Sequence, residues 1–505
     1  MFPSYHNPDT CPEWVERTKP AKGSNPDLPL DPIAVAGSVA LRRVLAWHEG
    51  RPLFMAGSLR TLLLGDADTW CGLDLGTEVR PLTDFTVFPR SSLPHMHLLA
   101  AWGVVERITR YQQDKRAWVS FFTVPKKEQV ARAIFDCRPV NALAGPPPRM
   151  RLIQMDTLHC TLTFFKKPWF STMDFRHWFY QLNVPDHAKR FFSLCCEDTR
   201  VAFQCKCWPM GFAWSTLAAQ AVTMVIILRA IYESGNTADP PADQDAPPPF
   251  WVVRGTNNRV TAFVTAYYDN IMVTTGNRFI RDKLSKAIEQ AAAHCGAILK
   301  SEPKRSQESV EFLGVLFRST ESRLHWRHVT DNITRWRQLG ASPPVTLRDA
   351  AQIVGIIIWD WTVSGTTLAS IDETLTLAAD IAAQATESES WNIQIGEHRA
   401  DLVDKLGCAL GAILEKEEAE RHLALSQVKP RTVYLASDAM NVAGAFMRID
   451  DVGRVVWWQR FFWTPEEEAQ SINWKETTAA LACLEHALEE ARDAEIRMAV
   501  DNSTA

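Results

Sequence analysis

The sequence predicts an α+β protein of more than one domain, in which carboxylates stand at the ends of strands. The chain has 505 residues, enough for two or more domains with cores of their own. Hydrophobic residues make up 46% and charged residues 22%, the balance of a globular chain. Apolar runs that lead to an aspartate occur twice in the middle of the chain, and a strand, helix, strand pattern with carboxylates follows near its end.

Asp269 lies at a polar step between two apolar runs, residues 263–268 and 271–274. A two-residue polar step between such runs predicts a β-hairpin. The hairpin would hold Asp269 at its tip, where a metal ion can reach the carboxylate. The alternative is a surface turn with a solvated aspartate.

Asp174 follows a short apolar run that begins at Phe170, and an aromatic-rich turn comes after it. We expect a strand that ends at this aspartate. Two carboxylates at the ends of neighbouring strands repel each other unless a cation lies between them. Two divalent ions bridged by such a pair suit phosphoryl transfer, because one activates the attacking oxygen and the other stabilises the leaving oxygen.

Five segments resemble motifs of the reverse transcriptases of retroelements, and their order and spacing are also those of that family. They are residues 132–141 (fingers), 174–182 (first palm motif), 208–215 (Pro-x-Gly motif), 267–270 (Tyr-x-Asp-Asp) and 311–314 (Phe-Leu-Gly). Each segment is short, but the resemblance to this family extends over most of the chain. The resemblance implies a right-hand polymerase with fingers, a ferredoxin-like palm, a thumb and a connection, followed by an α/β ribonuclease H-like domain.

The resemblance also implies domain boundaries. We expect an N-terminal extension at 1–75, fingers and palm at 76–318, a thumb at 319–372, a connection at 373–430 and a C-terminally incomplete ribonuclease H-like domain at 431–505. In the thumb, arginines alternate with tryptophans, which suits a surface that follows a nucleic-acid backbone. Buried tryptophans covered by arginines are the alternative.

By the same resemblance, Asp174 and Asp269 are the principal ligands of two Mg²⁺ or Mn²⁺ ions. Asn270 stands where the family has a second aspartate, and its amide still offers an oxygen. Lys304 is expected to protonate the departing pyrophosphate, with Lys300 in the same loop as the other candidate. A solvated basic turn is the alternative for both lysines.

The resemblance also implies a second group of residues that contact the incoming deoxynucleotide. Lysine and arginine on facing strands of a hairpin form a phosphate clamp, although an ordinary solvated hairpin has the same pattern. The aromatic ring five residues after Asp174 would clash with a 2′-hydroxyl, unless it belongs to the core. The expected contacts are Lys126, Lys127, Arg132, Phe179, Met210 and Gly211.

Near the end of the chain, the order strand-Asp438, helix-Glu476, strand-Asp501 resembles the ribonuclease H fold. By this resemblance the three carboxylates hold two metal ions that hydrolyse the RNA of an RNA–DNA hybrid. The segment Ser471–Glu476 with the later Asp501 is most similar to tyrosine-recombinase retroelements of the DIRS and VIPER kind.

The resulting hypothesis is an RNA- and DNA-directed DNA polymerase of a retrotransposon. Its partners would be an RNA template, a DNA primer, RNA–DNA hybrids, dNTPs and other retroelement-encoded proteins. Asn270 and the incomplete C-terminal domain motivate one alternative, a non-catalytic descendant that binds nucleic acid or a partner. An RNA-templated RNA polymerase is another, which Phe179 and the ribonuclease H-like segment disfavour.

Bulk properties limit the setting. The net charge of −5 counts mildly against a nucleic-acid enzyme, but an acidic chain can carry a basic cleft. Eleven cysteines without a secretory signal indicate a reducing, intracellular location in the cytoplasm or nucleus. We expect Cys195, Cys196, Cys205 and Cys207 to pack in a core rather than bind metal, and the apolar run 218–228 to be too short for a membrane span.

Overall fold

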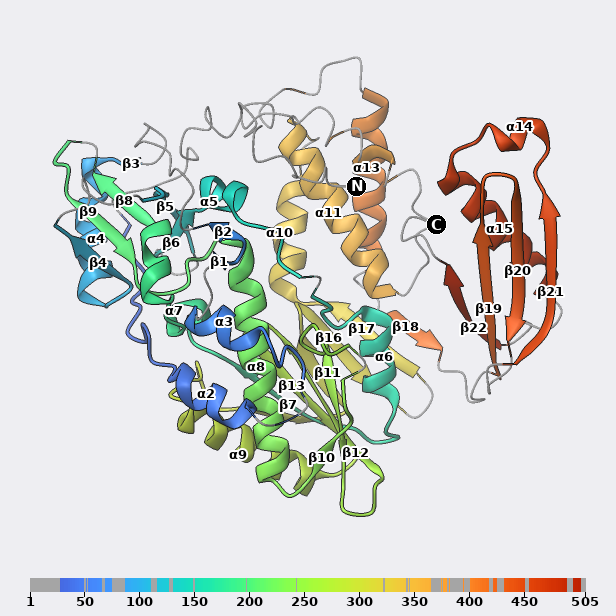
Figure 1. Ribbon diagram of the computed structural model, residues 1–505, viewed down its shortest axis with the longest axis horizontal. Coiled ribbons are helices and arrows are strands. Elements are labelled where there is room, and N and C mark those ends of the chain that lie inside the picture. The colour runs from blue at the N-terminus through green and yellow to red at the C-terminus, as the bar shows by residue number, and fades with distance from the viewer. Residues whose placement is uncertain are drawn as a thin grey trace. The chain divides into compact units, whose positions relative to one another are not determined.

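The computed structural model of the protein divides into two compact units, Met1–Leu423 and Ala424–Ala505, each described by itself (Figure 1). The described residues are 28–49, 51, 53–65, 69–74, 87–109, 116–126, 130–148, 150–196, 198–241, 243–320, 323–341, 344, 346–364, 374, 376–378, 381, 394, 400–416, 421–424, 431–449, 454–487 and 494–500. Helices and sheets are mixed throughout this part of the chain. The finer domain boundaries given above stay predictions.

A six-stranded antiparallel sheet forms the centre of the first unit, in the order β10-β11-β12-β13-β7-β14. Its strands are β7 (Trp169–Asp174), β10 (Thr237–Ala238), β11 (Phe250–Arg254), β12 (Val260–Tyr267), β13 (Asn270–Thr275) and β14 (Lys304–Gln307). Strands β7 and β13 lie inside the sheet, and their apolar side chains enter the main core. Helices α8 (Ala213–Glu233) and α9 (Arg278–His294) pack on this sheet and on each other.

Helix α8 is the most deeply buried helix segment of the core. It is 21 residues long, and by length and composition it could cross a membrane, but 83% of its apolar window is buried inside the protein. This burial is that of a core helix. The helix extends beyond the apolar run 218–228 at both ends, and it buries the polar side chains of Ser215, Gln220 and Thr223 together with the apolar ones.

Besides the two-stranded sheet of β1 (Thr69–Trp70) and β2 (Leu73–Asp74), two smaller sheets lie in the amino-terminal half of the first unit. One is the hairpin of β5 (Ser120–Pro125) and β6 (Ala131–Asp136), and the other has the order β3-β8-β9-β4. The remaining elements of this half are α2 (Leu41–His48), α3 (Leu59–Leu64), β3 (Val87–Phe88), η2 (Arg90–Ser92), α4 (Leu93–Ala101), β4 (Val105–Ile108), α5 (Arg138–Leu143), α6 (Met155–Thr163), α7 (Trp178–Gln181), η4 (Asp186–Phe191), β8 (Ser193–Cys196) and β9 (Ala202–Cys205).

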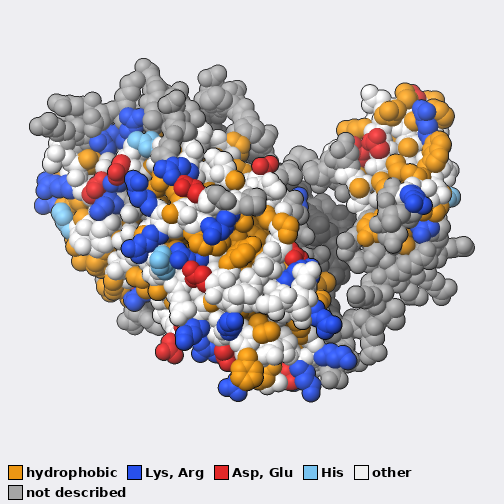
Figure 2. Space-filling model, turned by 60° about the horizontal axis from the view of Figure 1, so that its bottom comes forward, with side chains coloured by type: hydrophobic (Ala, Val, Ile, Leu, Met, Phe, Trp, Pro, Cys, Tyr) orange, Lys and Arg blue, Asp and Glu red, His pale blue; other side chains and the backbone are white. Residues whose placement is uncertain are grey.

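The four cysteines on or beside β8 and β9 are each at most 1% exposed, as expected for core packing. They are free thiols within an apolar environment. Figure 2 shows Lys and Arg side chains over much of the visible face of the first unit, so the chain's net negative charge is not uniform over its surface.

The rest of the first unit combines a sheet with a helical cluster. The sheet has the order β15-β16-β17-β18 and consists of β15 (Ser309–Phe312), β16 (Val315–Ser319), β17 (Arg323–His328) and β18 (Arg421–Ala424). Helices α10 (Thr330–Gly340), α11 (Leu347–Ser364) and α13 (Ala400–Lys416) share a separate core. Here Trp326 and Trp336 are 2% and 7% exposed, which agrees with the alternative of buried tryptophans.

The second unit holds a four-stranded sheet in the order β21-β20-β19-β22, with β19 and β22 parallel. Its elements are β19 (Arg431–Ala439), β20 (Ala443–Ile449), β21 (Val455–Phe462), α14 (Pro465–Glu468), α15 (Ile472–Ala487) and β22 (Ala494–Val500). Helix α15 packs on β19 and β20. The residues between Arg454 and Trp463 form one strand, β21, which pairs with β20.

Candidate active site

The central sheet places Asp174 and Asp269 side by side. Asp174 is the last residue of β7, and it pairs in register with Asn270, the first residue of β13. The Phe175 N–H donates to the carbonyl of Asp269 at 3.0 Å, which fixes the chain on both sides of the pair. Two aspartates that are far apart in sequence therefore meet at one end of two hydrogen-bonded strands.

The turn that carries Asp269 differs by one residue from the expected hairpin. Tyr267 pairs with Asn270, so the two turn residues are Tyr268 and Asp269, and Asn270 belongs to the returning strand. Tyr268 has a φ of 56°, a left-handed conformation that is uncommon outside glycine. The sequence did not reveal this turn, because a tyrosine gives no signal for a positive φ.

Helix α8 holds the turn in this conformation. Gln220 accepts a hydrogen bond from the Tyr268 N–H at 2.8 Å and donates to the Ala266 carbonyl at 3.1 Å. Thr223 donates to the Tyr268 carbonyl at 2.7 Å. Both side chains are fully buried, so each bond replaces water at a backbone group that would otherwise lack a partner. Gln220 and Thr223 are positioning residues that sequence reasoning missed, since a polar residue within an apolar helix does not name its partner.

The electrostatics of the pair favour a bound cation. Burial, and after it the nearby Asp174 carboxylate, raises the pKa of Asp269 to about 6. The two carboxyl groups are close enough for one to hydrogen-bond the other. A positive charge between them would remove the repulsion and return Asp269 to its ionised form.

Lys300 already provides one positive charge. Its ammonium lies 3.1 Å from Oδ2 of Asp174, and its backbone N–H donates to the Asp174 carbonyl at 2.7 Å. Lys304 lies on β14 and pairs in register with Thr172, two residues before Asp174. Both lysines, Asp174 and Asn270 line one cavity of about 470 Å³, which we call the carboxylate cavity. Its remaining lining residues are Thr172, Met173, Ser301, Ser306, Ser309, Val310, Glu311 and Leu316.

The donor set fits a hard divalent ion. Mg²⁺ binds proteins through one or two carboxylates and takes its other ligands from water and substrate phosphates. Asp174, Asp269 and the Asn270 amide provide such oxygens on adjacent strands. Within the described ranges no group of three or more His, Cys, Asp or Glu residues could hold a metal, so a complete protein-only cage is not formed there.

The residues predicted to form a phosphate clamp lie on and beside the β5–β6 hairpin. Arg132 on β6 is exposed and stands opposite Val124. Lys126 forms an ion pair of 2.5 Å with Asp31, and His177 lies 3.7 Å from the same carboxylate. Burial lowers the pKa of His177, which also lies close to Arg132 and Lys126. Asp31 was missed from the sequence, and it now competes with any phosphate for Lys126. Lys127 lies outside the described residues.

Gly211 lies in a turn that packs closely against the backbone of β6. Gly211 has a φ of +126°, and a Cβ there would stand 2.4 Å from the Phe135 carbonyl oxygen, so only glycine fits. Asn141 connects this turn to α8 by donating to the Gly211 carbonyl and accepting from the Ala213 N–H, both at 2.9 Å. Met210 is partly buried against the core.

The ring of Phe179 is only partly buried, and its centroid lies 6.4 Å from that of Tyr268. Its neighbours Trp178 and Tyr180 are 1% and 2% exposed and belong fully to the core. Phe179 therefore has one side towards the hairpin turn that carries Asp269.

In the second unit, two of the three expected carboxylates can be placed. Asp438 on β19 is exposed, and it pairs in register with Ala445. Glu476 on α15 is 7% exposed, and its Oε2 is a buried oxygen without a hydrogen-bond partner in the structure. An orphaned carboxylate oxygen is costly unless a cation or water satisfies it. Asp501 lies outside the described residues, so the three-carboxylate site stays a prediction.

Comparisons with known proteins add a likeness of fold. No protein-family model matches the chain, and no curated protein matches it. A foamy viral protease–reverse transcriptase in complex with an RNA/DNA hybrid is similar at 15% identity with a TM-score of 0.47. Two structures of such proteins with double-stranded DNA are similar at 14% identity with TM-scores of 0.45 and 0.43.

Each of these matches covers 84% of this chain. The chain spans 50% of the length of the protein in complex with the RNA/DNA hybrid. It spans 65% and 76% of the lengths of the two proteins with double-stranded DNA, which have the TM-scores 0.45 and 0.43. At such identities the likeness concerns the fold alone.

Proposed function

We propose that this protein is a DNA polymerase that copies RNA and DNA templates by two-metal nucleotidyl transfer. The observation that carries the proposal is the carboxylate pair: Asp174 ends β7 and lines the carboxylate cavity, and Asp269 lies in the turn directly before β13. Burial, and after it the Asp174 carboxylate, raises the pKa of Asp269, and a raised carboxyl pKa of this kind supports a functional site that binds cations. The five motifs in family order support the same function.

Asp174 and Asp269 would hold the ions, with Asn270 as a weaker oxygen donor. Bound Mg²⁺ or Mn²⁺ would supply activation of the primer 3′-hydroxyl and stabilisation of the leaving pyrophosphate. The ammonium of Lys300 or Lys304, both in the carboxylate cavity, would donate a proton to the pyrophosphate. Arg132 and Lys126 would bind the triphosphate, for which Lys126 must leave Asp31.

Phe179 and Gly211 would select the substrate. The partly exposed ring beside Tyr268 would exclude a 2′-hydroxyl, and the glycine backbone would allow the nucleotide to approach closely. Phe179→Ala is expected to improve ribonucleotide use relative to deoxynucleotide use by about 10- to 200-fold, the usual effect of a few atoms in a pocket. An unchanged preference would assign Phe179 to the core alone.

The second unit would cleave the RNA of RNA–DNA hybrids through Asp438, Glu476 and Asp501. The orphaned Oε2 of Glu476 supports a cation there. Placement among tyrosine-recombinase retrotransposons, and partnership with other retroelement-encoded proteins, are parts of this proposal that rest on sequence motifs alone.

One observation favours a second candidate, a non-catalytic descendant that only binds nucleic acid. The ammonium of Lys300 contacts Asp174, and an asparagine stands at position 270, so the pair can be neutralised without metal. A cationic side chain in contact with the first carboxylate is compatible with a binding protein as well as with an enzyme.

Primer extension on poly-rA/oligo-dT, with Mg²⁺ and Mn²⁺ in separate reactions, distinguishes the two candidates. The parent chain should extend the primer and Asp174→Ala should not. Extension in Mn²⁺ only would identify Asn270 as a weak ligand. A folded parent chain that binds the hybrid but extends in neither metal would overturn the polymerase and leave the binding protein.

A further inference from the structure

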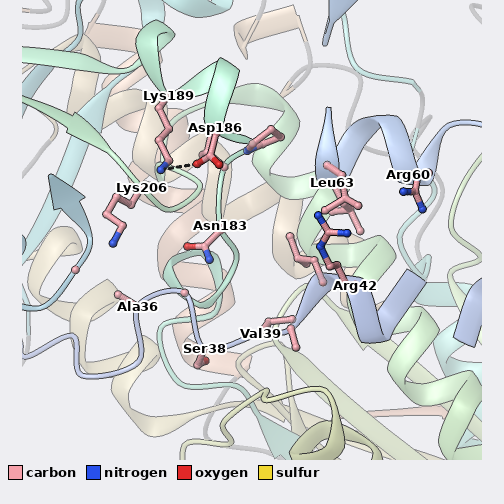
Figure 3. A pocket seen from close by; sticks show the side chains of 17 residues that line it. Ala36, Ser38, Val39, Arg42, Arg60, Leu63, Asn183, Asp186, Lys189 and Lys206 are labelled. Carbon is pink, nitrogen blue, oxygen red and sulfur yellow. Dashed lines mark ion pairs between the residues drawn. The ribbon is translucent and has the colours of Figure 1, made fainter. Parts of the chain in front are cut away.

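The first unit contains a second cavity that shares no lining residue with the carboxylate cavity, and we propose that it binds phosphoryl anions. It measures about 700 Å³ and is lined by side chains from distant parts of the chain (Figure 3). We call it the basic cavity, and its lining residues are Ala36–Arg42, Arg60, Leu63, Leu64, Gly103, Asn183–Asp186, Lys189 and Lys206. None of them lines the carboxylate cavity.

The wall of the basic cavity is fixed by backbone hydrogen bonds. The N–H groups of Gly37 and Val39 donate to the carbonyls of Tyr180 and Gln181 at 2.8 and 3.0 Å. The Val184 N–H donates to the Lys206 carbonyl at 2.9 Å, which joins the segment Asn183–Asp186 to the segment that carries Lys206. A cavity held in this way is formed before any ligand arrives, so little ordering is required on binding.

Four cationic side chains and a single carboxylate line the cavity. The carboxylate, Asp186, is already paired with Lys189 at 2.7 Å, and Lys189 also lies 3.3 Å from Glu106. Arg60 pairs with Glu49 at 2.7 Å. This leaves Arg42 and Lys206, neither of which forms an ion pair within the described ranges.

Figure 3 shows Arg42 and Lys206 on opposite sides of the cavity, with the Asn183 side chain between them in this view. The Asn183 amide nitrogen has no acceptor among the residues that the structure describes, so it can donate to a ligand. Helix α2 begins in the same wall without a side-chain cap at Ala40, and the N–H groups of Leu41 and Arg43 donate to the backbone carbonyls of Val39 and Ala40. The amino end of a helix favours an anion, and it adds to the two unpaired cations.

These donors select a ligand with several anionic oxygens. A guanidinium and an ammonium on either side, an amide donor between them and a helix start suit phosphate better than a single carboxylate, because phosphate presents more acceptors. Leu63, Leu64 and Pro185 add an apolar wall, and the volume lies in the range of small-ligand sites. The ligand is therefore a polyphosphate, either free, as in a nucleotide or pyrophosphate, or as the backbone of a nucleic-acid strand.

The test measures binding of two probes to the full chain in EDTA, so that metal-dependent binding at the carboxylate pair does not contribute. Tripolyphosphate is titrated by calorimetry, and a fluorescent oligo-dT strand is titrated by anisotropy at several salt concentrations. The double variant Arg42→Gln/Lys206→Gln removes both unpaired cations. Lys283→Gln is the matched control, since it removes an exposed charge on α9 that lines neither cavity.

We expect the double variant to bind at least about tenfold more weakly than the parent chain, because two charge-assisted contacts are lost. For the strand, the slope of log affinity against log salt should fall by about 0.7 for each lost contact. Weakening with tripolyphosphate alone assigns a free polyphosphate, and weakening with the strand alone assigns its backbone. Equal affinities for the double variant and Lys283→Gln in both arms would overturn the proposal.

Discussion

The two units place a carboxylate on an inner strand in different ways. In the first unit, Asp174 on β7 meets Asp269 through strand pairing, because β13 is hydrogen-bonded to β7 in register. In the second unit, Asp438 lies on β19, while Glu476 comes from a helix packed on that strand. A pair built by backbone pairing is set by the ladder itself, whereas a strand–helix pair depends on side-chain packing. We therefore expect activity at the first site to be more sensitive to substitution of a carboxylate, and less sensitive to substitution of neighbouring side chains, than activity at the second site.

The strongest test of this comparison replaces one carboxylate in each unit. Asp269→Asn should lower primer extension by at least about 10³-fold, since several kcal/mol of transition-state stabilisation depend on the ions. Asp438→Asn should leave primer extension within about twofold and affect only hydrolysis of RNA in a hybrid. The measurements are steady-state primer extension and hybrid cleavage, with circular dichroism to verify folding. Equal losses of extension in both variants would contradict the separation of the two sites.

Lysine substitutions in the carboxylate cavity give the next largest effect. Lys300→Gln and Lys304→Gln differ only in which ammonium is removed, and Lys300 is the one in contact with Asp174. The lysine that protonates pyrophosphate should lower the single-turnover rate by about 10²–10⁴-fold, and the other should have a small effect. Because Lys300 is 64% exposed, its loss should change the free energy of unfolding by less than about 1 kcal/mol. Similar small rate effects for both variants would remove either lysine from the proton transfer.

The clamp on the Tyr268 turn tests whether backbone pairing alone is sufficient. Gln220→Ala removes two hydrogen bonds and leaves the Tyr268 N–H and the Ala266 carbonyl buried without them. We expect a loss of about 2–3 kcal/mol in the free energy of unfolding and a lower extension rate. Gln290→Ala, an exposed change on α9, is the matched control in urea denaturation. A Gln220→Ala protein as stable as the control would show that the ladder fixes the turn unaided.

The smallest effect is on pH dependence. Because the pKa of Asp269 is raised to about 6, the folded protein holds a proton that the unfolded chain releases near pH 4. Without metal, the free energy of unfolding from this group should therefore fall as the pH rises from about 4 to about 6. Stabilisation by Mg²⁺ should grow over the same range, since the ion needs the ionised carboxylate. Thermal unfolding with and without Mg²⁺ measures both trends, and Asp269→Asn should abolish them.

Much of the local structure was predictable from the sequence. The apolar run 218–228 is evident in the sequence, and the structure has α8 at Ala213–Glu233 around it. The strand expected to end at Asp174 is confirmed by β7, Trp169–Asp174. The segment 236–249 is rich in proline and has no apolar period, which predicts a loop, but it contains β10, and its Asp239 forms an ion pair with Arg254. The strand that pairs with β10 is β11, which lies beyond the segment, so the residues of 236–249 alone could not indicate a strand.

The sequence by itself determined which residues carry charge at strand ends and where the long apolar segments lie, because periodicity and residue type act over a few neighbouring positions. Only the tertiary structure decided that β13 pairs with β7, that Gln220 holds a tyrosine in a left-handed turn and that Lys300 reaches Asp174. The same applies to Asp31, which takes Lys126, and to the unpaired Arg42 and Lys206. These contacts join residues far apart in the chain, and their free energy depends on burial and on partners that no local pattern specifies.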